Sequence, residues 1–475
     1  MRKIPSLLLA FALAVSPGMA NDLPDLGEAS RQHLSEKQER EIARSIMRDL
    51  YSSPNYLADA EIEAYLNNLG RRLAAESSAS GRSLTFFTMH DSSINAFALP
   101  GGHIGVHTGL LQSAESESEL AGVLAHEIAH VSQEHLSRMI AQHEQSYLPS
   151  LAALAVAVLA ARANANAGSA AIAASQALSL QSQLDFTREH EREADRIGLD
   201  ILTRANFDPR GMSGFFTRLQ RANRLYDNNA PDYLRTHPLN SQRIADMDGR
   251  VERMPYKQVR DSDEFHFMRA RLIAMSGTAD DAVNRLRDQV QNRKAPLQAA
   301  NHYGLSLALA RQHKLVEAEK ELASAMKESK SPVLSSLQAE LKIRMGRFEQ
   351  GLGLYQAAIA RHPLHMPLAY GYGSALLAAG QSQNAIDFAS AQTRLHPEDA
   401  RLWRLLAQAH AALGHKLGSH RAEAESLAAQ GNLAGAVEQI GLGLKAGDGD
   451  FYELSAAEAR RREWQETLAA ENRKK

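Results

Sequence analysis

Two histidines and a glutamate lie at a spacing that suits a divalent metal ion. His126, Glu127 and His130 form the pattern H-E-x-x-H within residues 120–139, where the apolar spacing predicts a helix. Residues four apart share one face of a helix, so both imidazoles can bind one ion. A glutamate beside the first ligand has the position of a general base. The segment therefore predicts a hydrolytic zinc site with one Zn2+ per chain.

The third zinc ligand must come from another part of the chain. A catalytic zinc ion usually has three protein ligands and one open position. One class of zinc proteases places a further histidine ten residues after the first and a glycine at seven, but here those positions hold Leu136 and Gln133. The chain contains no cysteine, so the ligand must be His, Asp or Glu. We expect a glutamate on a second helix.

Residues 189–200, EHEREADRIGLD, offer such a glutamate. Glu191 and Asp195 share a helical face, so Glu191 would bind zinc while Asp195 accepts the outer N–H of a metal-bound histidine. Glu193 points elsewhere on this helix. The alternative, a solvated charged face, is the weaker one beside H-E-x-x-H. The remaining nearby histidines, including His135, lack partner spacing and are interpreted as ordinary polar residues.

The elements that must position these residues are helices with a short β-rich segment between them. Residues 34–73 have amphipathic helical spacing, and the pattern is helical again from residue 116. Between them we expect three short strands, over residues 84–88, 95–99 and 103–106. Pro100-Gly101-Gly102 predicts a tight turn between the last two. This order predicts an α+β domain, mostly helical, with a small sheet packed against the helices.

The N-terminus has the features of a secretory signal peptide. Arg2 and Lys3 precede an apolar core over residues 7–15, and small residues suit cleavage after Ala20. This core has about ten residues, whereas a membrane helix needs about twenty. We therefore expect an exported chain that begins at Asn21, with a retained N-terminal anchor as the alternative.

A second apolar stretch covers residues 148–184. Its longest uninterrupted run, over residues 151–161, contains eleven apolar residues. Such a run is too short to span a bilayer. We expect a buried helix and a flap that acts as a lid near the metal, with a membrane contact as the alternative.

The second half of the chain is expected to be helical throughout. Turn positions recur every 34 residues, at Gln312, Gly346, Gly380 and Gly414. This period resembles the tetratricopeptide repeat, in which antiparallel helix pairs stack into an all-α solenoid with a concave face. An unrelated stack of helical hairpins is the alternative. The expected organisation is a signal peptide, a domain with the zinc site, a charged linker and a repeat domain, over residues 1–20, 21–250, 251–264 and 265–475.

Taken together, H-E-x-x-H and a later E-x-x-A-D resemble the M48 family of gluzincin metallopeptidases. Two further segments agree with this resemblance. Residues 95–102, NAFALPGG, resemble the edge strand that these enzymes lay beside the metal, and His237-Pro238 with Arg243-Ile244 resembles their H-P-x-x-x-x-R-I segment. The resemblance covers roughly residues 30–250.

The resemblance implies roles for individual residues. Zinc would be held by His126, His130 and Glu191. Glu127 would be the general base. His237 or Arg243 would donate to the oxyanion, so that replacing Arg243 by Ala lowers kcat and leaves the zinc in place. A second hypothesis makes His237 a fourth zinc ligand that holds the enzyme latent until a substrate arrives.

The edge strand is implied to bind substrate through Asn95, Ala96, Phe97 and Ala98. An extended peptide can add to such a strand through main-chain hydrogen bonds, which are indifferent to side-chain sequence. Broad specificity for unfolded or extended protein segments would follow. The alternative is that this segment is simply an internal hairpin.

The resemblance implies a periplasmic zinc endopeptidase that cleaves unfolded or misassembled proteins. With the signal peptide and repeats, it implies outer-membrane β-barrel proteins as substrates, their assembly machinery as a partner of the repeat domain, and peripheral contact with the outer membrane. The competing interpretation is a periplasmic chaperone or adaptor with a latent or structural zinc site. Glu127 favours chemistry, because a structural site needs no such carboxylate. The net charge of −2 gives no reason to expect nucleic acid.

Overall fold

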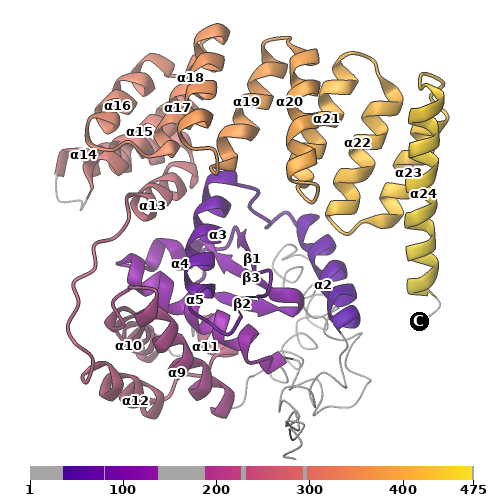
Figure 1. Ribbon diagram of the computed structural model, residues 1–475. Coiled ribbons are helices and arrows are strands. Elements are labelled where there is room, and N and C mark those ends of the chain that lie inside the picture. Colours follow the sequence, from indigo (N-terminus) through magenta and orange to yellow (C-terminus); the bar gives the residue numbers. More distant parts are fainter. Residues whose placement is uncertain (1–35, 80, 137–187, 226–231, 293–296, 473–475) are drawn as a thin grey trace, which may run out of the picture.

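The computed structural model describes residues 36–79, 81–136, 188–225, 232–292 and 297–472. The predicted signal peptide and the predicted lid over residues 148–184 lie outside these described residues. Within the described part of the chain, no helix combines the length and apolar character needed to cross a membrane. Figure 1 shows an N-terminal part of helices and strands beneath an arc of helix pairs.

A small mixed sheet lies within the N-terminal part (Figure 1). Its strands are β1 (Thr85–Met89), β2 (Ala96–Leu99) and β3 (His103–His107). β3 is central, since it pairs in parallel with β1 and antiparallel with β2. The short 3-10 helix η1 (Pro100–Gly102) joins β2 to β3, and its two glycines have φ of 76° and 78°, which glycine adopts without strain. The predicted sheet is confirmed, and β2 lies at its edge.

Helices enclose this sheet. They are α2 (Glu36–Tyr51), α3 (Ala60–Ala74), α4 (Thr108–Ser113), α5 (Glu117–Ser132), α9 (Arg188–Arg204), α10 (Arg210–Leu225), α11 (Asp232–Thr236) and α12 (Ser241–Val251). α5 is central, because it packs against α3, α9, α10 and β2 and is buried from Glu117 to His130. Gly198 of α9 faces the His126 backbone so closely that a Cβ there would lie 3.2 Å from the His126 Cα. A glycine at this position lets α9 approach α5, the helix that contains His126 and His130.

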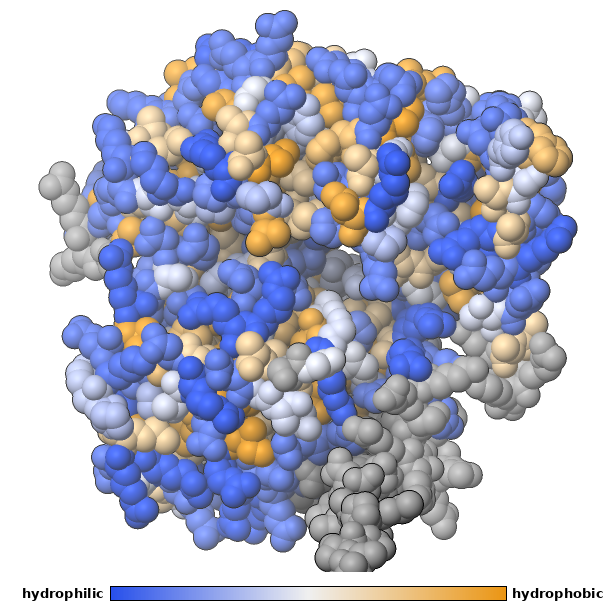
Figure 2. Space-filling view, viewed as in Figure 1, coloured by the Kyte–Doolittle hydropathy of each residue, from blue (hydrophilic) through white to orange (hydrophobic). Residues whose placement is uncertain are grey.

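The second half forms the expected all-α solenoid (Figure 1). Its helices are α13 (Asp263–Met275), α14 (Ala279–Asn292), α15 (Gln298–Arg311), α16 (Leu315–Glu328), α17 (Pro332–Arg344), α18 (Phe348–Arg361), α19 (Met366–Ala378), α20 (Ser382–Leu395), α21 (Ala400–Ala412), α22 (Lys416–Ala429), α23 (Leu433–Leu444) and α24 (Phe451–Asn472). Consecutive helices pack on each other along the arc. In Figure 2, hydrophilic residues cover most of the visible face of both halves, with hydrophobic residues scattered among them.

The 34-residue period marks the helix ends of the repeats. Gly346, Gly380 and Gly414 follow the C-cap residues of α17, α19 and α21 and have φ of 76°, 73° and 76°, the left-handed conformation that ends a helix. In the repeat formed by α15 and α16, His313 has this conformation, with φ of 60°, and Gln312 is the C-cap of α15. The turn of that repeat therefore comes one residue later than the period predicts.

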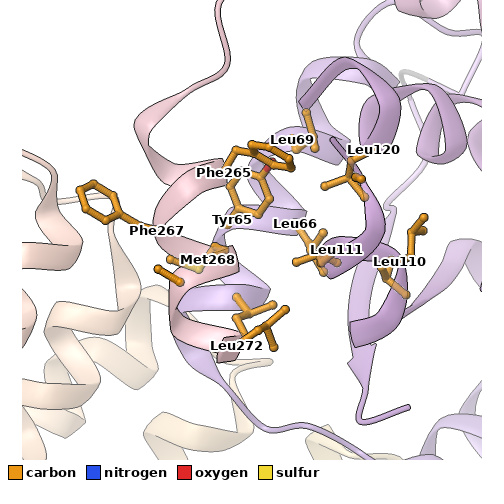
Figure 3. Packing of buried hydrophobic residues seen from close by; sticks show 14 of the residues in the cluster. Tyr65, Leu66, Leu69, Leu110, Leu111, Leu120, Phe265, Phe267, Met268 and Leu272 are labelled. Atoms are coloured by element: carbon orange, nitrogen blue, oxygen red, sulfur yellow. The ribbon is translucent and has the colours of Figure 1, made fainter. Parts of the chain in front are cut away.

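The hydrophobic core continues across the proposed domain boundary. Residues between the end of α12 and the start of α13 form no helix or strand, as expected of a linker. However, α13 packs directly against α3 and α4 (Figure 3). One cluster includes Leu66, Leu69, Leu110, Leu111, Phe265, Met268 and Leu272. The connector thus marks a change of architecture, while the first repeat helix is fixed to the N-terminal part.

Ion pairs hold the repeat helices to the first turn of α3. Its N-cap residue and two acidic residues of its first turn contact a residue of α13, the N-cap residue of α19 and a residue of α21. The pairs are Asp59 with Arg271 at 2.8 Å, Glu61 with His365 at 2.8 Å, and Glu63 with Arg401 at 2.7 Å. Asp59 also caps α3, because its side chain accepts the N–H groups of Glu61 and Ile62. The N-terminus of α3 is therefore a docking point for the solenoid.

Candidate metal centre

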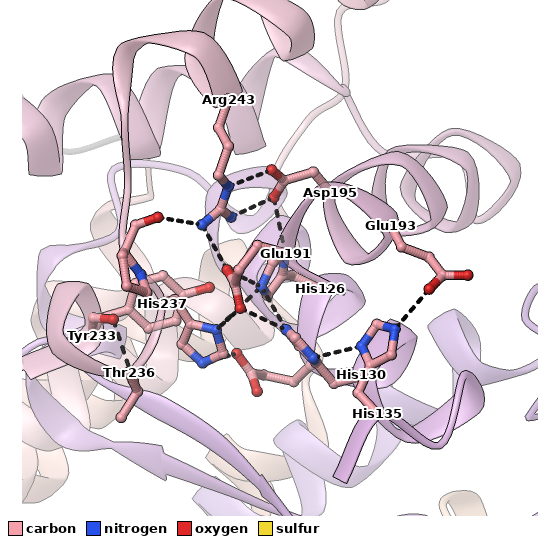
Figure 4. A network of polar contacts seen from close by, with 12 residues as sticks. His126, His130, His135, Glu191, Glu193, Asp195, Tyr233, Thr236, His237 and Arg243 are labelled. Atoms are coloured by element: carbon pink, nitrogen blue, oxygen red, sulfur yellow. Dashed lines mark hydrogen bonds and ion pairs between the residues drawn. The ribbon is translucent and has the colours of Figure 1, made fainter. Parts of the chain in front are cut away.

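Four side chains that can bind metal converge in the N-terminal part (Figure 4). His126 and His130 come from one face of α5, Glu191 from the first turn of α9, and His237 from the residue that follows α11. One ligand atom from each lies within 4.8 Å of the others, and all four residues are buried. The structure thus brings together the three predicted ligands and adds His237 to them.

The distances among the three predicted ligands suit zinc. His126 Nε2 lies 3.0 Å from His130 Nε2 and 3.6 Å from Glu191 Oε2, and His130 Nε2 lies 3.4 Å from Glu191 Oε1. Tetrahedral zinc with bonds of about 2.0 Å separates its donor atoms by about 3.3 Å. Two imidazoles and one carboxylate also form a donor set that zinc prefers. The residues present therefore fit a zinc ion.

His237 lies beside the three predicted ligands, and each of its ring nitrogens contacts a neighbouring side chain of the site. Its Nδ1 lies 3.0 Å from Glu191 Oε1 and 3.4 Å from His126 Nε2. Its Nε2 lies 3.5 Å from Glu127 Oε1. Tyr233, one turn earlier, stacks on the His237 ring at a centroid distance of 4.7 Å and fixes its plane. His237 is thus placed between the ligands and the predicted base.

Asp195 and Arg243 contact the predicted zinc ligands and hold their side chains in place (Figure 4). Asp195 Oδ1 lies 3.2 Å from His126 Nδ1, as expected for a carboxylate that orients this histidine. Arg243 is 1% exposed and donates to Asp195 through Nε and Nη2, both at 2.7 Å. Its Nη1 donates to the Pro238 carbonyl oxygen and lies 2.6 Å from Glu191 Oε2. These contacts favour an orienting role for Arg243, and its oxyanion role stays a prediction.

The sequence did not reveal a further contact to His130. Its Nδ1 lies 2.8 Å from His135 Nδ1, and His135 Nε2 lies 3.0 Å from Glu193 Oε2. We expected His135 to be an ordinary polar residue and Glu193 to point elsewhere. Helical periodicity could not place His135, because α5 ends at Ser132 and Glu134 has φ of 52°, which turns the chain back. Two further histidines that the sequence places near this motif, His103 and His107, lie in β3 at the sheet.

Burial sets the protonation states of the central groups. It raises the pKa of Glu127 to about 7, although His237 works against this. It lowers the pKa of His130 to about 3. Burial alone would raise the pKa of Glu191, but His237 and the two predicted ligand histidines hold it well below its usual value. A neutral His130 and an ionised Glu191 are the forms that bind a metal ion.

The predicted substrate strand lies beside α5. The Asn95 carbonyl oxygen accepts the His107 N–H at 3.0 Å, so these opposite residues form a hydrogen-bonded pair of β2 and β3. Pairs alternate along antiparallel strands, so the main-chain N–H and C=O groups of Ala96 and Ala98 point away from β3. The Ala98 N–H lies close enough to Glu127 to lower its pKa. Phe97 packs edge to face on Phe87 and anchors the strand.

The sequence was compared with known proteins. Residues 60–251 match peptidase family M48, and residues 342–409 match the tetratricopeptide repeat. The beta-barrel assembly-enhancing protease of Escherichia coli is 31% identical over 454 residues, which cover 92% of this chain and 91% of that one. A Vibrio cholerae relative is 34% identical over 440 residues, covering 91% and 90%. Mitochondrial metalloendopeptidase OMA1 of Schizosaccharomyces pombe is 31% identical over 205 residues, covering 42% and 56%.

Proposed function

The chain belongs to peptidase family M48 and is a zinc metalloendopeptidase with tetratricopeptide repeats, and from this premise we propose that it cuts extended segments of unfolded or misassembled outer-membrane β-barrel proteins in the periplasm. The name of the Escherichia coli relative supports this substrate class. The predicted signal peptide supports the location. The observation that carries the proposal is the position of β2, which lies at the edge of the described sheet and next to Glu127.

The chemistry divides among named side chains. His126, His130 and Glu191 would hold the zinc ion, which would supply a Lewis acid for the scissile carbonyl and for water. Glu127, with a pKa of about 7, would accept the proton of the attacking water and pass it to the leaving amine. Asp195 holds the proton of His126 on Nδ1, so that Nε2 faces the ion.

The substrate would bind as an added strand. The main-chain groups of Ala96 and Ala98 point away from β3, so an extended peptide that reaches this side of β2 would pair with them and bring its carbonyl toward Glu127. Such pairing recognises backbone, so it accepts any segment that can be extended. β-barrel proteins before assembly present many unpaired strands of this kind.

We place His237 as a gate within this proposal. Its Nδ1 has the position of a fourth ligand, and its Nε2 lies 3.5 Å from Glu127, in the space that the attacking water needs. Glu127, Glu191 and His237 are at most 1% exposed. The resting enzyme is therefore latent in this proposal, and His237 must move for cleavage. Once displaced from the ligand position, the same imidazole can donate to the oxyanion.

The repeat domain is proposed to bind clients or the outer-membrane assembly machinery. Solenoids of this type present an extended concave surface to other proteins, which supports that role. A periplasmic chaperone or adaptor is the second candidate. The burial of His126, His130, Glu191 and His237 favours it, because a substrate cannot reach a buried zinc site unless the site opens. Peripheral contact with the outer membrane would follow from binding that machinery.

The deciding experiment is cleavage of an unfolded outer-membrane β-barrel protein by purified residues 21–475, with zinc content measured. Glu127→Gln should keep its zinc and lose cleavage by about 100-fold or more, because the base is gone. Glu189→Gln is the matched control, since Glu189 is exposed on α9, and should cleave normally. If the wild-type protein holds one zinc ion and cuts nothing, the two remaining accounts are a latent enzyme gated by His237 and a chaperone. Cleavage by His237→Ala would then identify the latent enzyme, and no cleavage by this variant would favour the chaperone.

A further inference from the structure

A relay of side chains extends from His130 away from the ligand cluster (Figure 4). His130 Nδ1 lies 2.8 Å from His135 Nδ1, and His135 Nε2 lies 3.0 Å from Glu193 Oε2. His135 is fully buried, whereas the Glu193 side chain is 29% exposed. The relay thus connects a buried zinc ligand to a carboxylate near the surface.

Only one arrangement of protons satisfies the whole relay. His130 turns Nε2 toward His126 and Glu191, so its proton must be on Nδ1 when it binds zinc. That N–H can donate only if His135 Nδ1 accepts, so the proton of a neutral His135 must be on Nε2. The Nε2–H then donates to Glu193. The carboxylate at the far end therefore selects the tautomer of both rings.

The ring of His135 is also held in place. His190 stacks on it with a centroid distance of 4.5 Å and an interplanar angle of 21°. His190 directly precedes the ligand Glu191 in α9. The contacts of His135 therefore join the chain beyond α5 to α9, so both helices that supply zinc ligands hold the same ring. Rotation of His135 would break its contacts with His130 and Glu193 together.

We propose that His135 is a positioning residue that, held by Glu193 and His190, fixes the orientation and tautomer of His130 and so retains the zinc ion. His135 acts through His130 and touches neither the ion nor the substrate. The other zinc-binding histidine, His126, is oriented by direct contact with a carboxylate, since its Nδ1 lies 3.2 Å from Asp195 Oδ1. Each histidine ligand is then oriented by a different carboxylate: His126 by direct contact with Asp195, and His130 by Glu193 through the imidazole of His135. This inference rests on the zinc site of the proposed function and not on the identity of the substrate.

The test is zinc affinity of the full mature chain, measured by competition with a chromophoric chelator. Removing a group that orients a ligand weakens metal binding by about 10- to 100-fold. Glu193→Ala should show this loss, because it removes the carboxylate that accepts the His135 Nε2–H. Glu193→Gln should retain tighter binding than Glu193→Ala, since its amide oxygen still accepts the His135 N–H. Glu189→Ala, on the exposed side of the same helix, should bind like the wild type.

Two further measurements separate positioning from general damage. His135→Phe keeps the ring volume but removes both nitrogens, and should weaken zinc binding as Glu193→Ala does. The visible spectrum of the cobalt(II) form should change in both variants, because the geometry of His130 changes. If His135→Phe does not fold, Glu193→Ala decides the question.

The proposal is overturned if Glu193→Ala binds zinc as tightly as the wild type with an unchanged cobalt spectrum. It is also overturned if Glu189→Ala loses as much affinity as Glu193→Ala, since the loss would then be unrelated to His135. The readout needs no substrate. Failure to cleave β-barrel proteins would therefore leave this result standing, and the two ideas can fail separately.

Discussion

Replacing Arg243 by Ala removes the cation that lies between two buried carboxylates. The guanidinium makes two 2.7 Å hydrogen bonds to Asp195 and one 2.6 Å contact to Glu191, and it is 1% exposed. Removing one partner of a buried ion pair costs about 3–5 kcal/mol, because the other charge stays buried and unpaired. We expect the free energy of unfolding of the zinc-free protein to fall by that amount.

Zinc binding should weaken as well. Asp195 and Glu191 both lose the donor that orients them, and loss of such a group lowers metal affinity by about 10- to 100-fold. Urea unfolding followed by circular dichroism measures the first effect, and chelator competition measures the second. Arg250→Ala is the matched control on the same helix, because Arg250 makes an exposed pair with Asp246 that is worth at most about 0.5 kcal/mol.

The hypothesis from sequence predicts the opposite outcome. If Arg243 donates to the oxyanion, Arg243→Ala lowers kcat while zinc content and stability stay near those of the wild type. That result would refute the orienting role argued from the contacts of Arg243. A variant that loses zinc and unfolds at lower urea, beside an unaffected Arg250→Ala, would instead remove the oxyanion assignment.

Three other substitutions test separate parts of the molecule. His237→Ala should raise basal cleavage of an unfolded protein, because the gate is gone; an unchanged or lower rate would favour the oxyanion role. Arg401→Ala breaks the half-buried pair with Glu63 and should lower the free energy of unfolding in urea by about 1.5–3 kcal/mol, with faster proteolysis between α3 and the repeats; equal protease resistance would argue against docking through α3. Gly70→Ala should destabilise by about 1–3 kcal/mol in the same assay, since its Cβ would lie 2.0 Å from Phe86 Cε2, while Gly81→Ala meets no atom within 4 Å and should be neutral.

The repeat domain shows how far a periodic pattern reaches. Glycines 34 residues apart predicted where helices end, because a left-handed residue after the C-cap is a local requirement. The glycine pattern did not predict the turn at His313, because this residue adopts φ of 60° although it is not a glycine. Nothing periodic predicted that Arg271, His365 and Arg401 would meet the first turn of α3. Such pairs join residues hundreds of positions apart, and their partners depend on how the arc curves.

Residue spacing along the chain was enough to identify side chains that could hold the metal. His126 and His130 are one helical turn apart, so their geometry is local, and Glu191 with Asp195 repeats that spacing on a second helix. The short strands and the turn between them are local in the same sense. These features follow from periods of about two and 3.6 residues.

How the remaining residues contact those ligands depends on the packing of separate elements and could not be read from spacing. Arg243 contacts Asp195 and Glu191, and His237 lies among the zinc ligands. His135 lies between His130 and Glu193 and contacts both. Each contact depends on a chain reversal or on the approach of two helices, as where φ of 52° at Glu134 returns the chain toward α9. Sequence spacing specifies positions within one element, whereas contacts between elements require the packing of the whole domain.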